Sequence, residues 1–300
     1  MTQRRSLARV GIAAAGILTL GLLAGCSADS GDKAEAGSTL EKAKDSGTIT
    51  IAVANERPYS WVDGNGDPQG ATYAMHKEIF ENLGIDNIKV VESDWNSLIP
   101  GLNAGRFDVV SAGMSILPDR CAKAAFSDPE IMYTTALMVP EGNPKGLTDL
   151  DSVKATDGDV KLAVLAGGIE SGYAKDLGIS NTVEVDNAQD GMDIVSNGRA
   201  DAFAMTAISL NWMADKNPDA GVETTDAFVQ VIDGVEQIGA GSTVFRKGDT
   251  KLLDAYNEEL AKITGDPDTY MALVGDYGFT EENLPPEDLT TEQLCKGDLG

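Results

Sequence analysis

Short apolar segments rich in β-branched residues alternate with segments of helical spacing in two blocks of the chain, at about 48–135 and 160–232. The run TITIAVA at 48–54 predicts a strand, and 74–83 predicts a helix that ends at Gly84. The second block repeats the strand–helix alternation three times. Because successive βα units pack as open sheets with helices on both faces, the sequence predicts an α/β fold with two sheets.

Two stretches, 136–145 and 236–246, are the natural connections between the predicted blocks. We expect 47–136 together with 243–300 to form lobe 1, and 137–242 to form lobe 2. Two lobes joined by two strand-like connections leave a cleft between them, and ligand sites favour such interfaces. The expected architecture is therefore a pair of βα lobes joined by a two-strand hinge, with the ligand in the cleft.

The N-terminus has the layout of an export signal, with three arginines among the first nine residues and an apolar stretch at 10–25. That stretch is shorter than the about 20 residues that span a bilayer, although a short membrane anchor would look similar. Leu-Ala-Gly-Cys at 23–26 resembles a bacterial lipobox. It predicts a lipoprotein signal peptide at 1–25 and a diacylated Cys26, so that lipid alone would anchor the chain to the outside of the cell membrane.

Residues 26–46 are small, polar and charged, a composition that cannot bury a core and predicts a flexible tether. The other two cysteines, Cys121 and Cys295, are an even pair in a chain predicted to be exported, where disulfides persist. We expect a disulfide between them. Two buried free thiols are the alternative.

Acidic residues outnumber basic ones by 48 to 23, for a net charge of −25. Without the predicted signal peptide, 20 basic residues would remain and the net charge would be −28. Such a charge repels nucleic acid and anionic lipid, because phosphate binding needs clustered Lys and Arg. One His and three Cys exclude most zinc sites and His-rich catalytic arrays, so we expect no metal, cofactor or catalytic residue. His76 stands beside Lys77 and Glu78, which predicts a solvated helix face.

The segment VESDWNSLIPGLNAGRFDVVSAGMSILPDRCAKAAFSDP at 91–129 resembles the family 3 solute-binding proteins of ABC importers. The resemblance continues at 164–175, 198–209 and 244–263 and extends over about 48–280. It implies a type II periplasmic-binding-protein fold and a monomer that is not an enzyme. It also implies ABC permease subunits as partners and a polar amino acid or a related compound as ligand.

Within this family, the Arg-Cys pair at 120–121 and VLAGGIE at 164–170 are most similar to the ectoine and hydroxyectoine binders. The similarity implies capture of a small zwitterionic compatible solute for import, and hence a role in osmoprotection. A receptor for polar amino acids is the first alternative. A dehydratase-like enzyme on the same fold is the second, although no acid–base pair stands out in the sequence.

The resemblance assigns the ligand carboxylate to Arg120, whose planar guanidinium matches two carboxylate oxygens and keeps its charge. Gly113 and Ser115 precede it at the end of a predicted buried strand. They would line the same site, because alternate residues of a strand face the same way. From the residues alone, a surface ion pair of Arg120 with Asp119 or Asp128 is the alternative.

The cationic end of the ligand is implied to lie against Trp95 and Tyr59, whose rings can hold a cation by cation–π contact. Glu56 would supply the negative charge, because a cation in a dry cleft needs a partner. The alternatives are plain core packing for the two rings and a solvated loop position for Glu56.

Lobe 2 contributes two further features to the predicted site. Amino-acid binders usually have Asp at the position of Thr206, where it pairs with the ligand ammonium. Threonine in place of that Asp favours a ligand cation with delocalised charge, as in ectoine. Ser115, in contrast, resembles the residue found in the amino-acid binders. Gly167-Gly168-Ile169 opens a predicted helix, and the amides of Gly168 and Ile169 would donate to the ligand carboxylate. Close packing of that helix on its strand is the alternative.

Overall fold

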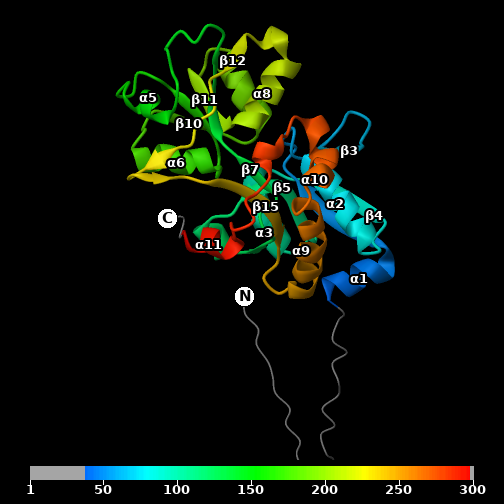
Figure 1. The fold of residues 1–300 in the computed structure, drawn as a ribbon. Helices are drawn as coiled ribbons and strands as arrows, with labels where there is room; N and C mark the ends of the chain where they lie inside the picture. Colours follow the sequence, from blue (N-terminus) through cyan, green and yellow to red (C-terminus); the bar gives the residue numbers. More distant parts are fainter. Residues whose placement is uncertain (1–37, 298–300) are drawn as a thin grey trace, which may run out of the picture. The chain divides into compact units, whose positions relative to one another are not determined.

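The computed structural model describes residues 38–297, so the predicted signal peptide and Cys26 lie outside the described residues. Within that range the chain forms a six-stranded and a five-stranded sheet, each covered by helices (Figure 1). We refer to the first sheet with its helices as lobe 1 and to the second as lobe 2. The arrangement confirms the predicted two-lobed α/β fold.

The sheet of lobe 1 is built mainly from the first block and is completed by a strand that returns from lobe 2. Its strand order is β4-β1-β5-β15-β6, and β7 also pairs with β15. β1 is parallel to β4 and β5, whereas the returning β15 is antiparallel to its neighbours. The strands are β1 (Thr48–Val53), β4 (Asn87–Glu92), β5 (Val109–Ser115), β6 (Ala125–Phe126), β7 (Ile131–Tyr133) and β15 (Gly239–Phe245).

The sheet of lobe 2 has the strand order β10-β9-β11-β8-β12. β9 is parallel to β10 and β11, and β8 is antiparallel to β11 and β12. The strands are β8 (Thr135–Pro140), β9 (Leu162–Leu165), β10 (Thr182–Val185), β11 (Ala202–Thr206) and β12 (Val222–Thr224). Two small hairpins complete the strands: β2 (Trp61–Val62) with β3 (Pro68–Gln69), and β13 (Val231–Ile232) with β14 (Val235–Glu236).

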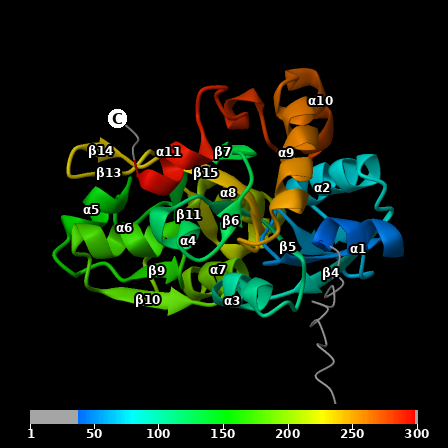
Figure 2. The same ribbon diagram turned by 90° about the horizontal axis from the view of Figure 1, so that it is seen from below.

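The helices follow the predicted alternation, and their apolar stripes face the sheets. In α9, for example, Leu252, Tyr256, Leu260 and Ile263 are buried at helical spacing. Lobe 1 carries α1 (Thr39–Ser46), α2 (Ala71–Asn82), α3 (Leu98–Asn103), α4 (Pro118–Cys121), α9 (Thr250–Thr264), α10 (Pro267–Val274) and α11 (Thr291–Lys296). Lobe 2 carries α5 (Leu150–Lys154), α6 (Ile169–Leu177), α7 (Ala188–Ser196) and α8 (Ala207–Lys216). In the second view α4 and α11 lie side by side (Figure 2).

The chain passes between the sheets twice. β7 ends at Tyr133 in the first sheet and β8 begins at Thr135 in the second, and the chain has returned to the first sheet by Gly239. The expected lobe limits after 136 and before 243 would cut through β8 and β15. We therefore propose lobe limits at these two crossings instead.

Helix α1 contradicts part of the predicted tether. Ser38 accepts a hydrogen bond from the Glu41 amide, and Glu41 accepts one from the Ser38 amide, which together form a capping box. Ala43 is buried, and Thr39 Oγ1 donates to Asp249 Oδ1 at 2.7 Å. The prediction of a flexible tether is therefore wrong for residues 39–46. A single buried alanine with polar caps leaves almost no hydrophobic signal in the sequence, and residues 26–37 lie outside the described range.

His76 is also placed differently from the prediction. It is fully buried on α2, where Nε2 lies 2.7 Å from Thr243 Oγ1 on β15, and burial lowers the pKa of the imidazole to about 4. It belongs to a polar network with Tyr256 and Glu130, whose carboxylate accepts a hydrogen bond from the Tyr256 hydroxyl. The prediction of a solvated face was wrong because it relied on Lys77 and Glu78, which follow His76 in sequence but point to other sides of the helix.

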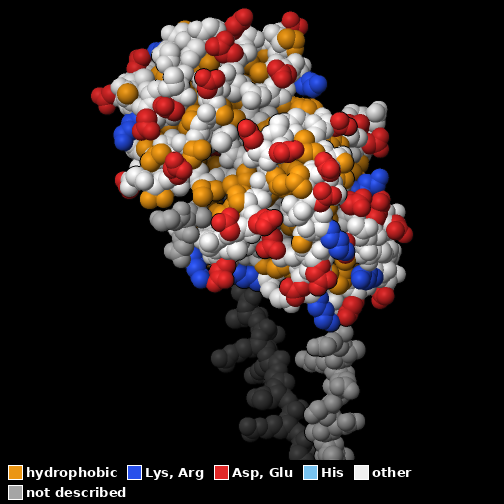
Figure 3. All heavy atoms as spheres, viewed as in Figure 1, with side chains coloured by type: hydrophobic (Ala, Val, Ile, Leu, Met, Phe, Trp, Pro, Cys, Tyr) orange, Lys and Arg blue, Asp and Glu red, His pale blue; other side chains and the backbone are white. Residues whose placement is uncertain are grey.

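Two observations concern membrane and metal sites. None of the helices within 38–297 is long and apolar enough to cross a membrane. The same part of the chain contains no group of three or more His, Cys, Asp or Glu residues that could hold a metal ion. On the face drawn in Figure 3, acidic side chains are scattered over both lobes, in line with the acidic composition.

Candidate functional site

A small cavity of about 20 Å³ lies between the two sheets, where β5 of lobe 1 and β9 and β11 of lobe 2 end. Open α/β sheets bind ligands at such carboxyl ends, because the loops that follow the strands can carry side chains. Eight of the nine predicted ligand residues line the cavity: Glu56, Tyr59, Trp95, Gly113, Ser115, Gly168, Ile169 and Thr206.

Tyr59 forms the wall of the cavity on the lobe 1 side. It is almost completely buried, and its ring makes edge contacts with Tyr133 at 6.1 Å and Phe279 at 5.5 Å between centroids. Gly113 allows this position, because it has a φ of +54° and a Cβ there would lie 2.6 Å from the Tyr59 ring. Gly113 therefore acts by making room for Tyr59, a role that the spacing argument did not anticipate.

Arg120 lies next to the cavity without lining it. Only 7% of its surface is exposed, and its guanidinium donates to Ser115 O at 3.0 Å and to Gly167 O at 2.8 Å. Its Cζ lies 5.5 Å from the centre of the Trp95 ring, whose indole N–H donates to the same Gly167 oxygen at 3.1 Å. Both donors therefore reach from lobe 1 to one carbonyl of lobe 2.

The surface ion pair considered as an alternative for Arg120 does not form. Asp119 pairs with Lys123 at 3.6 Å instead. No carboxylate of residues 38–297 forms an ion pair with Arg120. Burial lowers the pKa of the guanidinium, but arginine remains protonated in proteins. The structure thus holds a buried positive charge that contacts two backbone carbonyls and the Trp95 ring and forms no ion pair within residues 38–297.

Two carboxyl groups line the cavity. Glu56 is buried and accepts a hydrogen bond from Ser209 Oγ of α8 at 2.8 Å, and burial raises its pKa to about 7. Glu170, in the first turn of α6, is buried as well, and burial followed by the charge of Glu56 raises its pKa to about 8. The sequence prediction missed Glu170, because an acid in the first turn of a helix is also ordinary dipole stabilisation.

Three polar atoms around the cavity are buried and make no hydrogen bond within the described residues: Tyr59 Oη, Glu170 Oε1 and Thr206 Oγ1. Burial raises the pKa values of Glu56 and Tyr59, and the nearby Thr206 hydroxyl opposes that rise in both, although Thr206 Oγ1 forms no hydrogen bond within the described residues. Buried polar atoms are nearly always paired in folded proteins. Such a cluster at one cavity indicates a polar ligand.

The start of α6 differs from the prediction. Gly168 and Ile169 line the cavity, but the Gly168 amide already donates to Leu165 O at 2.9 Å. The Gly167 carbonyl, rather than an amide, faces Arg120. The segment that leads into α6 therefore presents the Gly167 carbonyl and the Glu170 carboxyl, which suit a cation better than an anion, and donation by the Ile169 amide stays a prediction.

The cysteines next to the site are bonded. Cys121 and Cys295 form a disulfide with their Cα atoms 5.7 Å apart, which joins α4 to α11. Ser115 is fixed from two sides, because Tyr133 donates its hydroxyl hydrogen to Ser115 Oγ while Arg120 donates to Ser115 O. Tyr133 also lines the cavity, and the sequence prediction missed it.

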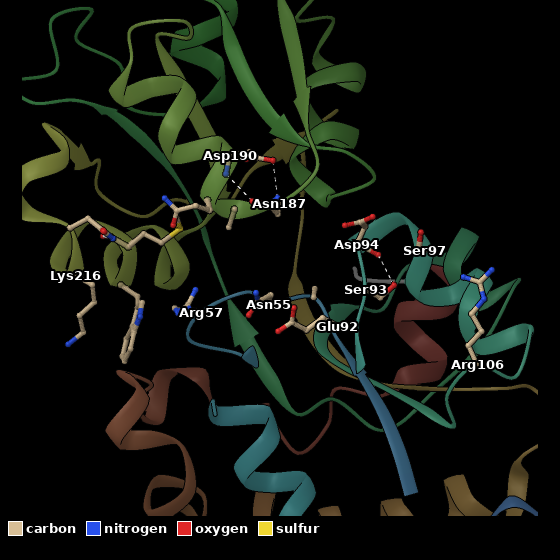
Figure 4. Close-up of a pocket in the computed structure, with 16 residues that line it drawn as sticks. Asn55, Arg57, Glu92, Ser93, Asp94, Ser97, Arg106, Asn187, Asp190 and Lys216 are labelled. Atoms are coloured by element: carbon tan, nitrogen blue, oxygen red, sulfur yellow. Dashed lines mark hydrogen bonds between the residues drawn. The ribbon is translucent and has the colours of Figure 1, made fainter. Parts of the chain in front are cut away.

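A larger groove of about 1010 Å³ also lies between residues of the two lobes (Figure 4). Asn187 and Asp190 face it from α7, and Glu92, Asp94 and Arg57 face it from lobe 1. It contains none of the predicted ligand residues, and Asn187 and Asp190 bond to each other. The small cavity, with its buried charges and unbonded polar atoms, is therefore the candidate ligand site.

Two sheets joined by two crossings, with a polar cavity between them, define a class of two-lobed ligand-binding proteins. The chain belongs to the bacterial extracellular solute-binding proteins, family 3, whose sequence pattern matches residues 49–278. This membership confirms the family that the motifs at 91–129 resemble.

Among its relatives, the chain is 37% identical to the probable amino-acid ABC transporter periplasmic-binding protein y4tE of Sinorhizobium fredii, over 86% of each chain. It is 30% identical to the lysine/arginine/ornithine-binding periplasmic protein of Escherichia coli, over 87% of this chain and 95% of the relative. Among solved structures, EhuB in complex with hydroxyectoine superposes with a TM-score of 0.76 and 32% identity, over 86% of this chain and 97% of EhuB. The ancestral amino acid-binding protein AncCDT-1, a precursor of cyclohexadienyl dehydratase, superposes with a TM-score of 0.70 and 27% identity, over 80% of this chain and 99% of the ancestral protein.

Proposed function

We propose that the protein is the substrate receptor of an ABC importer and captures a small zwitterionic compatible solute, ectoine or hydroxyectoine. The observation that carries the proposal is a buried Arg120 that forms no ion pair within the described residues, next to a cavity lined by the buried Glu56 and Glu170. A buried charge needs a partner. A zwitterion whose carboxylate meets Arg120 and whose cation meets the two acids provides both. The likeness to EhuB supports this ligand class.

Ligand entry requires the lobes to separate, because about 20 Å³ holds little more than one water molecule. Opening would break the bond between Arg120 Nη2 and Gly167 O of lobe 2, which frees that donor for a ligand carboxylate. Tyr59 and Trp95 would then flank the ligand, and the unbonded Glu170 Oε1 would accept from its cationic end. Closure around the ligand follows, because only the closed form makes both sets of contacts.

Isothermal titration calorimetry against ectoine, hydroxyectoine, proline betaine and the common amino acids tests the proposal. We expect saturable heat with ectoine or hydroxyectoine and weaker or no heat with the other compounds. Absence of heat with every compound would overturn the ligand assignment, and tighter binding of an amino acid would replace it.

A receptor for polar or cationic amino acids is the second candidate. Two buried carboxyl groups and one guanidinium lie at or next to the cavity, so a ligand with an extra positive charge would balance the site when both acids are ionised. The names of the two relatives support the same class. Thr206→Asp separates the candidates, because an acid there should pair with a primary ammonium and shift preference towards amino acids. An unchanged ligand profile would place Thr206 outside the selective contacts.

An enzyme on the same fold is a third candidate, raised by the likeness to a dehydratase precursor. The named binding proteins among the relatives support a receptor instead. Incubation of ligand with excess protein, followed by chromatography, should return the ligand unchanged. Conversion to a product would favour the enzyme.

We further propose that Cys26 carries the lipid anchor and that an ABC permease is the partner. Metabolic labelling with a fatty acid should mark the parent chain but not Cys26→Ser. Labelling of both chains would overturn the anchor. Stimulation of ATP hydrolysis in the reconstituted importer by the liganded receptor would test the partner, and no stimulation would remove it.

A further inference from the structure

The residue that faces the proposed ligand site and the residue that bonds the C-terminal segment are neighbours in one short helix. Helix α4 spans only Pro118–Cys121. Arg120 is directed to the cleft, where it donates to Ser115 O and Gly167 O, whereas Cys121 is bonded to Cys295 of α11. A helix of one turn does not hold its own geometry in water. The orientation of α4 therefore depends on what packs against it.

Helix α11 provides that packing. Leu294 is 2% exposed and belongs to an apolar cluster with Ile116, Ala124 and Phe126, which precede and follow α4 in the chain. Thr291 Oγ1 donates to Ser127 O at 2.6 Å. The C-terminal helix thus packs against α4 and both of its flanking segments, and α4 and α11 lie next to each other in Figure 2.

We propose that α11, held by the Cys121–Cys295 disulfide, positions Arg120 for the ligand carboxylate. The proposal rests on the proposed function only in naming that carboxylate. Successive residues of a helix point about 100° apart. The bond from Cys121 to α11 therefore prevents α4 from rotating about its axis. Because Arg120 is the preceding residue of α4, the same bond fixes the direction of its side chain. Cys121, Leu294 and Cys295 are positioning residues, since none of them lines the cavity.

The two cysteines are far apart in sequence, and a covalent bond therefore adds an attachment between α11 and α4 that the chain itself does not provide. They lie 174 residues apart, so α11 is attached to α4 neither by a short loop nor by a strand. Without the disulfide, six residues of helix with one fully buried leucine would have to hold the C-terminus in place. Opening of α11 would leave α4 exposed on one side and free to move Arg120.

The first test compares binding affinities by calorimetry with the panel compound that binds best. The variant is Cys121→Ser/Cys295→Ser, and the control is Leu260→Ala in α9, a buried residue of lobe 1 outside the α4 cluster. Both variants should lower Tm. We expect Kd to rise at least tenfold in the disulfide variant and less than twofold in the control. Unchanged affinity in the disulfide variant, or an equal loss in the control, would overturn the proposal.

The second test asks whether the loss acts through Arg120. The background for this test is Arg120→Lys, which keeps a positive charge but lacks the planar guanidinium. Adding the two cysteine substitutions to Arg120→Lys should change Kd by less than twofold relative to Arg120→Lys alone. A further tenfold loss would show that α11 acts on binding by another route and would overturn the proposal. Leu294→Ala keeps the disulfide and serves if the double serine variant does not fold. It should raise Kd several-fold, again only with Arg120 present.

A third measurement needs no ligand. In the parent, the Arg120 guanidinium should give slowly exchanging N–H signals in NMR spectra of ¹⁵N-arginine-labelled protein, assigned by their loss in Arg120→Lys. We expect them to exchange rapidly in the disulfide variant and slowly in Leu260→Ala. Slow exchange in all three proteins would overturn the positioning role. If NMR shows the expected exchange pattern but calorimetry detects no heat with any compound, the positioning role of α11 is supported and only the proposed function is overturned.

Discussion

At the scale of single residues, the candidate site has one buried basic group and two buried acidic groups, and none of them forms an ion pair within the described residues. Arg120 is bonded to carbonyls of Ser115 and Gly167, while the cavity beside it has two carboxyls, Glu56 and Glu170. Carbonyl dipoles solvate a cation but do not cancel its charge, and the raised pKa values of the acids show that these are costly to ionise where they lie. Both features favour a ligand that brings charges of its own.

The role of Arg120 leads to a prediction about affinity. Arg120→Ala should abolish measurable binding of a carboxylate ligand, a loss of 100-fold or more, because a charge-assisted bidentate contact is removed from a buried site (about 3 kcal/mol or more). Calorimetry measures the loss. Lys123→Ala is the matched control, since Lys123 is largely exposed and pairs with Asp119, and it should bind normally. Near-normal affinity of Arg120→Ala would refute the carboxylate assignment.

The two acids lead to a prediction about pH. With pKa values of about 7 and about 8, Glu56 and Glu170 gain protons as pH falls from 9 to 6, which removes the negative charge that a cationic group needs. Affinity should therefore fall about tenfold or more over that range. In Glu170→Gln the part of this change centred near pH 8 should disappear, whereas Glu92→Gln in the larger groove should leave the profile unchanged. Equal affinity at pH 6 and pH 9 in the parent would contradict this electrostatic role.

At the scale of elements, the site depends on strands that end together and on glycines that let neighbouring segments approach. β5 ends beside Tyr59 only because Gly113 has no side chain. The strand and helix order was predictable, since spacings of two and of three to four residues are local properties of the chain. Helix α1 and helix α11 were not predicted, because each is short and buries few apolar side chains.

The close approach at β5 leads to a prediction about stability. Gly113→Ala should lower the free energy of unfolding by roughly 2 kcal/mol or more and weaken ligand binding, because the new methyl group displaces Tyr59. Chemical denaturation and calorimetry measure the two effects. Gly105→Ala is the control, since Gly105 also has a positive φ of +69° but open space around it. It should lose only about 1 kcal/mol. Equal losses in the two variants would mean that the contact with Tyr59 is unimportant.

At the scale of the whole described chain, individual side chains connect the two lobes. Apart from the bonds to Gly167 O and the bond from Ser209 to Glu56, Trp61 of β2 meets Trp212 of α8 at 5.9 Å between ring centroids. Arg57 and Lys216 lie over the two rings at 5.5 and 4.9 Å. These residues lie outside the small cavity, so they can favour the closed arrangement without contacting a ligand.

The tryptophan pair leads to a prediction about closure. Trp212→Ala should raise Kd roughly two- to tenfold, because an aromatic pair contributes about 0.5–1.5 kcal/mol and is made only when the lobes are closed. Small-angle X-ray scattering should show a fall in radius of gyration when the parent binds ligand, and a larger value for the unliganded variant. Trp212→Phe keeps a ring and should lose less. An affinity equal to that of the parent would assign the pair no role in closure.

The order of strands and helices, the family and most of the cavity-lining residues were determined by the sequence itself, because they depend on local periodicity and on motifs that are contiguous in the chain. Tertiary structure decided the rest. His76 is buried because side chains of β5, β15 and α9 surround its face of α2, and Glu170 becomes part of a charged cavity because α6 brings it near Glu56 of lobe 1. Arg120 is backed by α11 from the far end of the chain. Each of these contacts joins residues distant in sequence, and no local pattern specifies which buried faces will meet.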